Sequence, residues 1–537
     1  MRIITLAILL VFNSGMYAQV SKTWVADQSN GTYKNPVLHA DYSDPDAIRV
    51  GDDYYMTASS FEDVPGLPIL HSKDLVNWKL IGHALNKLVP EQHFSAARHG
   101  EGVWAPSIRY HKNEFYIYYP DPDFGIYLVK AKHPAGPWSD PILVEGGKGL
   151  IDPCPLWDED GKVYLVHAFA GSRAGFKSIL VVKQMNAEGT KTIDDGVIVY
   201  DGHEMDPTVE GPKFYKRYGH YYIFAPAGGV STGWQLVLRS KNIYGPYERR
   251  NVMDQGATGV NGPHQGAWVS TAGGEDWFLH FQDKEAYGRI VHLQPMKWIN
   301  GWPVIGEDKD GDGKGEPVMQ YKKPNAGKVY PISTPPESDE FNESKLGLQW
   351  QWMGNPQPAW AMPFPATGVL QMFSVLMPDS AKNLWQLPNV LQQKWPAENF
   401  VMTTKLDFFP NTKIENERAG LAVMGLDYAG LAVKSTKNGN QLVYLECKQA
   451  DKNGKETELV ISELKTPTIW LRVEVKEGGK CSFSYSTDGN TFIHAGPVFT
   501  ARPGRWKGAK TGIFCTRTTV TNDAGFAAFD YFRVIKN

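Results

Sequence analysis

The sequence has few cysteines, almost no net charge and no long apolar run beyond its N-terminus. Its 4 cysteines among 537 residues are too sparse for a disulfide framework or a zinc site. Lys+Arg (55) and Asp+Glu (58) leave a net charge of −3, so no basic excess supports nucleic acid as a partner. Because no later stretch approaches the about 18 apolar residues of a membrane helix, we expect no membrane span in the mature chain.

Aromatic residues and turn formers are abundant instead. The chain has 17 Trp, 25 Tyr and 24 Phe, together 12% of its residues, with 53 Gly and 36 Pro. This composition is typical of an all-β protein with many turns. At about 100–200 residues per domain, the length predicts two or three domains.

Residues 1–18 are predicted to be a secretory signal peptide. Arg2 supplies the positive start, Ile3 to Phe12 the apolar run, and Gly15 to Ala18 the small-residue exit, which is the order of a cleaved leader. We therefore expect an exported protein, periplasmic or alternatively extracellular.

A turn followed by an aromatic-rich strand recurs five times. The central residues of these strands are separated by 61, 48, 58 and 56 residues, and they are Tyr55, Tyr116, Tyr164, Tyr222 and Phe278. Four short strands and their turns need about 40–50 residues, so each period predicts one propeller blade. We expect a five-bladed β-propeller over residues 33–320.

A second regularity lies 11 or 12 residues before each of these aromatic residues. The phrases there are Asp44-Pro45-Asp46, Trp104-Ala105-Pro106, Asp152-Pro153-Cys154, Glu210-Gly211-Pro212 and Gly266-Ala267-Trp268. Taken singly, each acid is a turn former. As equivalent positions in radially repeated blades, the three acids and Trp104 are expected to meet at the mouth of the central channel.

Convergent carboxyl groups are what glycoside hydrolysis requires. One carboxylic acid protonates the leaving oxygen, and one carboxylate activates water or attacks directly. Like charges at one site disfavour joint ionisation, so the pKa values of such a group should move apart.

With these phrases the chain resembles the family 43 glycoside hydrolases. The matching segments run in order through the first domain and include Asn35-Pro36-Val37-Leu38, Ser43-Asp44-Pro45-Asp46, Val103-Trp104-Ala105-Pro106, Ile151-Asp152-Pro153, Val209-Glu210-Gly211-Pro212, His264-Gln265-Gly266 and Tyr287-Gly288-Arg289. The resemblance implies a five-bladed propeller and an inverting mechanism. It also implies that Asp44 is the general base, Glu210 the general acid, and Asp152 the carboxylate that orients this acid and keeps its pKa raised.

Three further residues have two interpretations each. Trp104 resembles a wall of the sugar pocket, or it packs a blade. Arg289 resembles an arginine that hydrogen-bonds sugar hydroxyls, or it forms a salt bridge between blades. His264 matches a histidine near the axis that touches a cation in relatives, or it is a core residue.

An acidic turn imitates a calcium loop. Asp308, Asp310 and Asp312 alternate as oxygen ligands do in such loops, but Met319 stands where the bidentate Glu would be. A structural calcium ion and a simple polar turn are both open, and the expected reaction requires no cofactor.

The C-terminal part is predicted to be a second domain. Residues 321–337 are rich in Pro and polar residues, as in a linker, and strand alternation follows in residues 338–537. We expect a jelly-roll, concanavalin-like β-sandwich, similar to the lectin-like domain appended to many family 43 enzymes. It binds glycan or braces the propeller, and bracing is favoured because its aromatic residues mostly alternate as core residues do. Cys447, Cys481 and Cys515 form one disulfide or stay free.

The expected function is an exo-acting, inverting glycosidase. The resemblance favours release of terminal α-L-arabinofuranosyl residues from plant hemicellulose or its oligosaccharides. The alternative is a β-D-xylosidase acting on 1,4-linked xylooligosaccharides. A non-catalytic glycan-binding propeller and a retaining glycosidase are further options. The expected partner is thus an oligosaccharide or polysaccharide, and the sequence predicts no oligomeric state.

Overall fold

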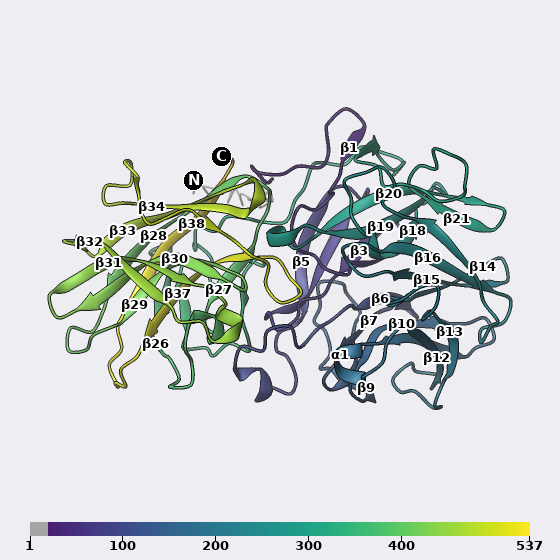
Figure 1. Cartoon of the computed structure of the whole chain (residues 1–537), viewed down its shortest axis with the longest axis horizontal. Coiled ribbons are helices and arrows are strands. Elements are labelled where there is room, and N and C mark those ends of the chain that lie inside the picture. The colour runs from purple at the N-terminus through teal and green to yellow at the C-terminus, as the bar shows by residue number, and fades with distance from the viewer. Residues whose placement is uncertain (1–19) are drawn as a thin grey trace, which may run out of the picture.

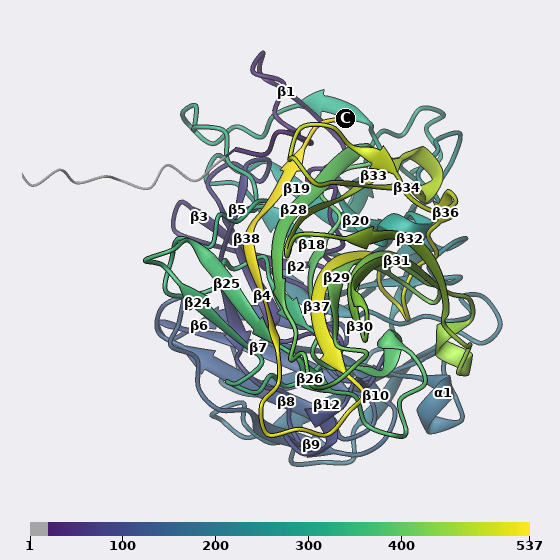
Figure 2. The same ribbon diagram turned by 90° about the vertical axis from the view of Figure 1, so that its left-hand side faces the viewer.

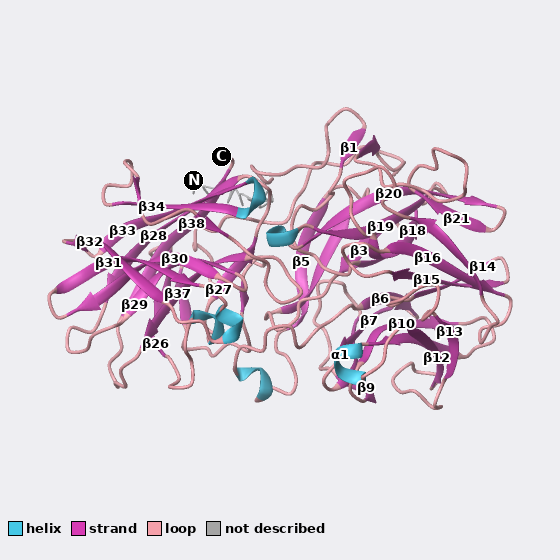
Figure 3. Cartoon of the chain, in the orientation of Figure 1, coloured by secondary structure: helices cyan, strands magenta, loops and turns pink. Residues whose placement is uncertain are grey.

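The computed structural model describes residues 20–537, and strands dominate it (Figure 3). The predicted signal peptide lies outside this range. The described chain folds into a propeller, formed by its first part, and a sandwich that packs against one side of it (Figure 1). The expectation of an all-β chain with a five-bladed propeller followed by a β-sandwich is therefore confirmed.

Each blade is an antiparallel sheet of four consecutive strands. Within residues 20–537 the blades are β2 (Asp46–Val50), β3 (Asp53–Thr57), β4 (Gly66–Ser72) and β5 (Trp78–Leu85); β6 (Ser107–His111), β7 (Glu114–Asp121), β8 (Gly125–Ala131) and β9 (Ile142–Gly146); β10 (Leu150–Trp157), β11 (Val163–Phe169), β12 (Ile179–Met185) and β13 (Val197–Asp201); β14 (Lys213–Arg217), β15 (His220–Ala227), β16 (Trp234–Ser240) and β17 (Glu248–Met253); and β18 (His264–Ser270), β19 (Asp276–Asp283), β20 (Arg289–Ile299) and β21 (Trp302–Ile305). The five repeated aromatic residues all fall in the second strand of their blade.

The first strands of the blades surround the axis. β2 packs beside β6 and β18, and β10 packs beside β6 and β14. The repeated phrases stand at or just before the start of these strands, or in the strand itself for Asp152 and Gly266. The repeat thus predicted which strand of each blade is innermost.

The ring is closed by pairing the two ends of the first domain. β1 (Thr32–Lys34) pairs antiparallel with β22 (Gln320–Lys322). Next to it the Asn35 side chain accepts a hydrogen bond from the Leu293 amide and donates to the carbonyls of Leu293 and Val318. Because Leu293 belongs to the fifth blade, these contacts fix the chain that enters the first blade against the last one.

The sandwich consists of two eight-stranded sheets within the described chain (Figure 2). One contains β23 (Gln351–Trp352), β26 (Val375–Leu376), β27 (Leu391–Lys394), β29 (Arg418–Met424), β30 (Tyr428–Thr436), β31 (Gly439–Cys447), β32 (Thr457–Leu464) and β37 (Lys510–Arg517). The other contains β24 (Ala361–Phe364), β25 (Val369–Phe373), β28 (Phe400–Phe409), β33 (Thr468–Lys476), β34 (Lys480–Ser486), β35 (Ile493–His494), β36 (Phe499–Thr500) and β38 (Phe526–Ile535). Their facing side chains form one core with Trp350, Phe483 and Phe529. All four cysteines are free and buried. Of the two expectations for Cys447, Cys481 and Cys515, the structure therefore has free thiols and no disulfide.

Helices are short. In the described part of the chain they are η1 (His93–Ser95), α1 (Gly171–Ala174), η2 (Glu285–Tyr287), η3 (Leu384–Gln386), η4 (Ala450–Lys452) and η5 (Glu477–Gly479). In residues 20–537 no helix has the length and apolar character needed to cross a bilayer.

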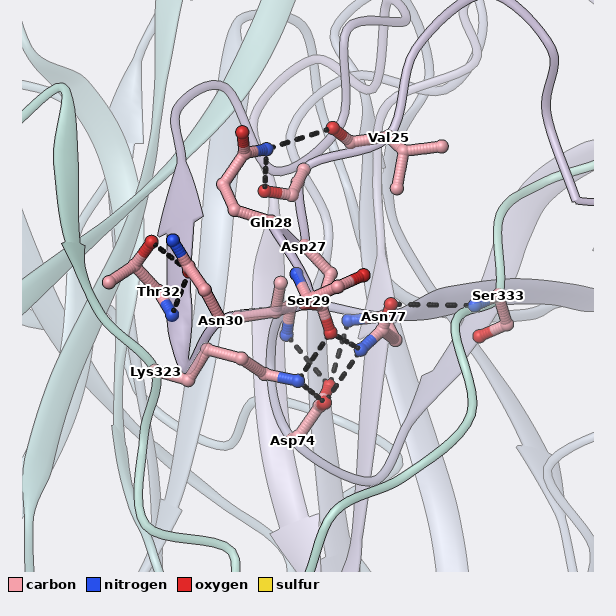
Figure 4. A network of polar contacts seen from close by, with 12 residues as sticks. Val25, Asp27, Gln28, Ser29, Asn30, Thr32, Asp74, Asn77, Lys323 and Ser333 are labelled. Atoms are coloured by element: carbon pink, nitrogen blue, oxygen red, sulfur yellow. Dashed lines mark hydrogen bonds and ion pairs between the residues drawn. The ribbon is translucent and has the colours of Figure 1, made fainter.

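The segment between the domains is tied to the propeller at its start. Lys323 Nζ lies 2.5 Å from Asp27 Oδ2 and 2.9 Å from Asp74 Oδ2, and Asn77 donates to both carboxylates (Figure 4). Farther along, the Ser333 amide donates to Asn77 Oδ1 at 3.4 Å. The segment predicted to be a linker is thus attached to the propeller at two points. At Lys323 the two buried carboxylates share one cation, and at Ser333 the backbone binds Asn77.

Replacing Lys323 by Met should destabilise the protein by about 3–5 kcal/mol, since it leaves two buried carboxylates facing each other without their cation. Denaturant titration measures this loss. Lys322→Met is the matched control, because Lys322 is exposed on the neighbouring strand position and should change stability by less than about 0.5 kcal/mol. Equal effects of the two substitutions would contradict the role given to Lys323.

Candidate active site

A cavity of about 300 Å³ lies where the blades converge. The five residues predicted for catalysis and substrate binding all line it, namely Asp44, Trp104, Asp152, Glu210 and Arg289. They come from all five blades. The predicted convergence around one small hollow is therefore what the fold produces.

Asp44 precedes β2 and is 4% exposed. Its φ of 54° lies in the left-handed region that non-glycine residues seldom adopt and that often marks functional sites. Ser59 Oγ donates to Asp44 Oδ2 at 2.5 Å, and Arg289 Nη1 lies 3.0 Å from Oδ1 and 3.2 Å from Oδ2. Arg289 thus forms the expected salt bridge between the fifth and first blades. It also lines the cavity, and its contact with sugar hydroxyls stays a prediction.

Asp152 lies at an irregularity in the pairing of β10 with β11 and has a φ of 57°. It is 2% exposed. Burial raises its pKa to about 7; the hydrogen bond from the Gly211 amide opposes this rise, and the charge of Asp44 adds to it. That amide donates to Asp152 Oδ2 at 2.7 Å. Because Gly211 directly follows Glu210, Asp152 fixes the backbone next to the third acid.

Glu210 precedes β14, and its side chain is 24% exposed, so it is the most accessible of the three acids. Burial among the other carboxyl groups raises its pKa to about 8, with the charges of Asp152 and Asp44 adding to the effect and Arg289 opposing it. A carboxyl group with such a pKa keeps its proton at neutral pH and can donate it. Burial thus raises the pKa values of both Asp152 and Glu210, and the expected separation of pKa values among the three acids stays a prediction.

Two tryptophans form a wall of the cavity. The Trp104 and Trp506 rings lie 6.0 Å apart in an edge-to-face arrangement. Trp506 belongs to the loop between β36 and β37 of the sandwich and is 44% exposed. Sequence reasoning missed it, together with Gln265, whose Nε2 lies 3.4 Å from Asp152 Oδ2. Gln265 was detectable as the neighbour of the fifth repeated phrase, whereas Trp506 stands in a loop with no periodicity.

His264 is fully buried beneath Glu210, with Nε2 3.5 Å from Glu210 Oε1. Neither of its ring nitrogens has a hydrogen-bond partner, and burial lowers its pKa to about 3, so the ring is neutral. Among residues 20–537 it belongs to no group of three or more side chains able to ligate one metal ion. The cation contact of His264 stays a prediction.

The acidic turn does gather its carboxylates, since ligand atoms of Asp308, Asp310 and Asp312 lie within 4.8 Å of one another. Each of the three carboxylates accepts a hydrogen bond from an amide of its own loop, including that of Gly311 on Asp308. Lys314 Nζ also lies 3.0 Å from Asp312. The carboxylates of the turn thus have hydrogen-bond and ion-pair partners in their own loop, and calcium binding stays a prediction.

Comparison with known proteins matches both domains. Residues 33–303 match the model for glycosyl hydrolases family 43, and residues 338–535 match the beta xylosidase C-terminal concanavalin A-like domain. A putative beta-xylosidase of Xylanibacter ruminicola is 40% identical over 92% of this chain and 88% of that protein. A non-reducing end alpha-L-arabinofuranosidase of Bacteroides ovatus is 30% identical over 83% of this chain and 81% of that protein.

A solved structure has the same two-domain fold. The xylan beta-1,4-xylosidase from Bacillus halodurans C-125 superposes with a TM-score of 0.81 and 26% identity, covering 94% of this chain and all of that one. Together with the cavity of three acids at the propeller axis, these matches show that the chain belongs to glycosyl hydrolase family 43 and carries that family's concanavalin-like C-terminal domain.

Proposed function

We propose that this family 43 glycosidase is an exo-acting, inverting β-D-xylosidase that removes terminal xylose from 1,4-linked xylooligosaccharides. The observation that carries hydrolysis is the division of labour in the cavity, with Glu210 holding its proton and Asp44 paired with Arg289. The choice of sugar is supported by the 40% identical relative, which is named a putative beta-xylosidase. The sequence alone favoured an arabinofuranosidase, and this remains the second candidate because of the 30% identical relative of that name.

In the proposed reaction Glu210 gives its proton to the glycosidic oxygen while the bond from that oxygen to the anomeric carbon breaks. Asp44 takes a proton from a water molecule, whose oxygen bonds to the anomeric carbon on the opposite face. Inversion requires the two carboxyl groups to stand about 6.5–9.5 Å apart, which leaves room for this water. Arg289 holds Asp44 in place, and Asp152 fixes the backbone behind Glu210 and helps to keep its pKa raised.

The shape of the cavity supports action at a chain end. Asp44 and Asp152 are almost completely buried, whereas Glu210 and Trp506 are partly exposed. The terminal sugar then lies among the acids, and the departing part points past the tryptophans. We further propose that the protein is exported and works without a cofactor.

Wild-type enzyme should hydrolyse 4-nitrophenyl β-D-xyloside with a higher kcat/KM than the matching α-L-arabinofuranoside. Proton NMR of 4-nitrophenyl β-D-xyloside hydrolysis should show α-xylose as the first product, because water attacks the face opposite the leaving group. A preference for the arabinofuranoside would select the second candidate. Initial β-xylose would mean retention, and no turnover of either glycoside would leave a binding protein.

Asp44→Asn and Glu210→Gln should each reduce kcat by about 10²–10⁴-fold on xylobiose, since each removes one proton transfer. With a 4-nitrophenyl leaving group, which needs little protonation, Glu210→Gln should recover much of its rate and Asp44→Asn should not. The pattern is measured by steady-state kinetics, with circular dichroism to establish that the variants fold. Full activity in either variant would refute its assigned role.

The alkaline limb of the pH profile should report Glu210. Because its pKa is raised to about 8, the required proton is present below that pH and is lost as the pH rises through it, so kcat/KM should fall above about pH 8. Asp152→Asn removes a neighbouring negative charge and should shift this limb to lower pH. An unmoved limb would show that Asp152 does not act on the proton of Glu210.

A further inference from the structure

Glu62 stands at the point where the two domains meet beside the cavity. It lies between β3 and β4 and is fully buried. Its carboxylate pairs with Lys507 of the sandwich, accepts a hydrogen bond of 2.7 Å from His99 Nδ1, and accepts another of 3.2 Å from the Gly100 amide. A buried charge is costly unless it is paired and hydrogen-bonded, and here its partners come from both domains.

One branch of these contacts leads to Trp104. The Gly100 amide is held by Glu62, and the Gly100 carbonyl accepts the Trp104 indole N–H at 3.0 Å. Gly100 has a φ of 77°, and a Cβ there would lie 2.2 Å from Cγ of Arg505. The backbone that orients Trp104 is therefore clamped between Glu62 and the sandwich loop.

The other branch leads to Trp506. Its neighbour Lys507 is bound to Glu62, and the following amide, of Gly508, donates to Asp41 Oδ2 at 2.9 Å. Trp506 itself has a φ of 63°, a conformation that a bulky residue keeps only when its surroundings enforce it. The contacts of Lys507 and Gly508, which directly follow Trp506, supply this constraint.

The adjacent acid, Asp63, differs in one respect. It is equally buried and pairs with Lys507 at 2.9 Å, with Lys510, and with Gln392 Nε2 at 2.9 Å. The partners of its carboxylate all belong to the sandwich, and it has no link to Gly100. Asp63 therefore joins the domains without reaching Trp104.

We propose that Glu62 is a positioning residue that holds Trp104 of the propeller and Trp506 of the sandwich in register, so that the departing part of the substrate stacks against both rings. The proposal rests on the glycosidase function proposed above. It assigns Glu62 no contact with substrate. Its effect passes through the hydrogen bond to Gly100 and the ion pair with Lys507.

Glu62→Gln tests the proposal. Gly100 and Lys507 donate to different oxygens of the Glu62 carboxylate, and glutamine has an NH₂ group in place of one of these oxygens. One of the two contacts is therefore lost. KM for xylobiose should rise about three- to tenfold, the worth of a favourable aromatic contact, while kcat changes by less than about twofold because the acids are untouched. Asp63→Asn is the matched control. It weakens one contact of Lys507 but keeps the Glu62–Lys507 pair and the Gly100 hydrogen bond, so it should lower the melting temperature and raise KM much less than Glu62→Gln does. Equal KM changes in the two variants would overturn the proposal.

A second experiment places the effect on the tryptophans. In a Trp104→Ala/Trp506→Ala background, adding Glu62→Gln should leave KM unchanged, because the rings through which it acts are gone. A further increase of several-fold would show that Glu62 acts by another route.

Hydrogen exchange on the free protein separates this proposal from the proposed function. Amides of residues 98–104 and 502–509 should exchange faster in Glu62→Gln than in Asp63→Asn, with no substrate present. If wild-type protein hydrolyses neither glycoside, the function fails while this comparison still decides the positioning role. Equal exchange in the two variants would refute the role even in an active enzyme.

Discussion

The site depends on one constraint, which is that five blades close into a ring and bring the starts of their first strands together. Asp44, Asp152 and Glu210 are far apart in the sequence and share a cavity only because β2, β10 and β14 surround the same axis. Closure by β1 with β22, and by Asn35 with the fifth blade, therefore matters to chemistry as well as to stability. It also brings Arg289 from the last blade against Asp44 of the first.

The three acids that meet in the cavity differ in their contacts with positive charge. Three carboxyl groups line one cavity together with Arg289, which makes its direct contact with Asp44. Burial raises the pKa values of both Glu210 and Asp152. The charge of Asp44 adds to both shifts, and the charge of Asp152 adds to that of Glu210.

The sequence predicted what repeats along the chain. The spacing of the aromatic strands is set by blade geometry, so it predicted the five blades, and the phrases in register with it predicted the acids and Trp104. Contacts that depend on how the two domains dock leave no such period, and so the roles of Trp506 and Glu62 were not predicted. The ion pairs of Lys323 with Asp27 and Asp74 join segments far apart in the sequence and likewise leave no period. The choice between two pentoses escaped as well, because it rests on the shape of a pocket to which a distant loop contributes.

The seating of Trp506 in a propeller cavity has a consequence for how such enzymes diversify. A lineage that exchanged its C-terminal module for one with another loop would alter the boundary of its substrate cleft while inheriting every acid unchanged. Substitutions in the C-terminal domain are also constrained, because its loop borders the cavity in which the acids of the propeller lie. The two domains of this chain are therefore expected to be inherited together. In chimaeras made from homologues, both domains should come from the same parent.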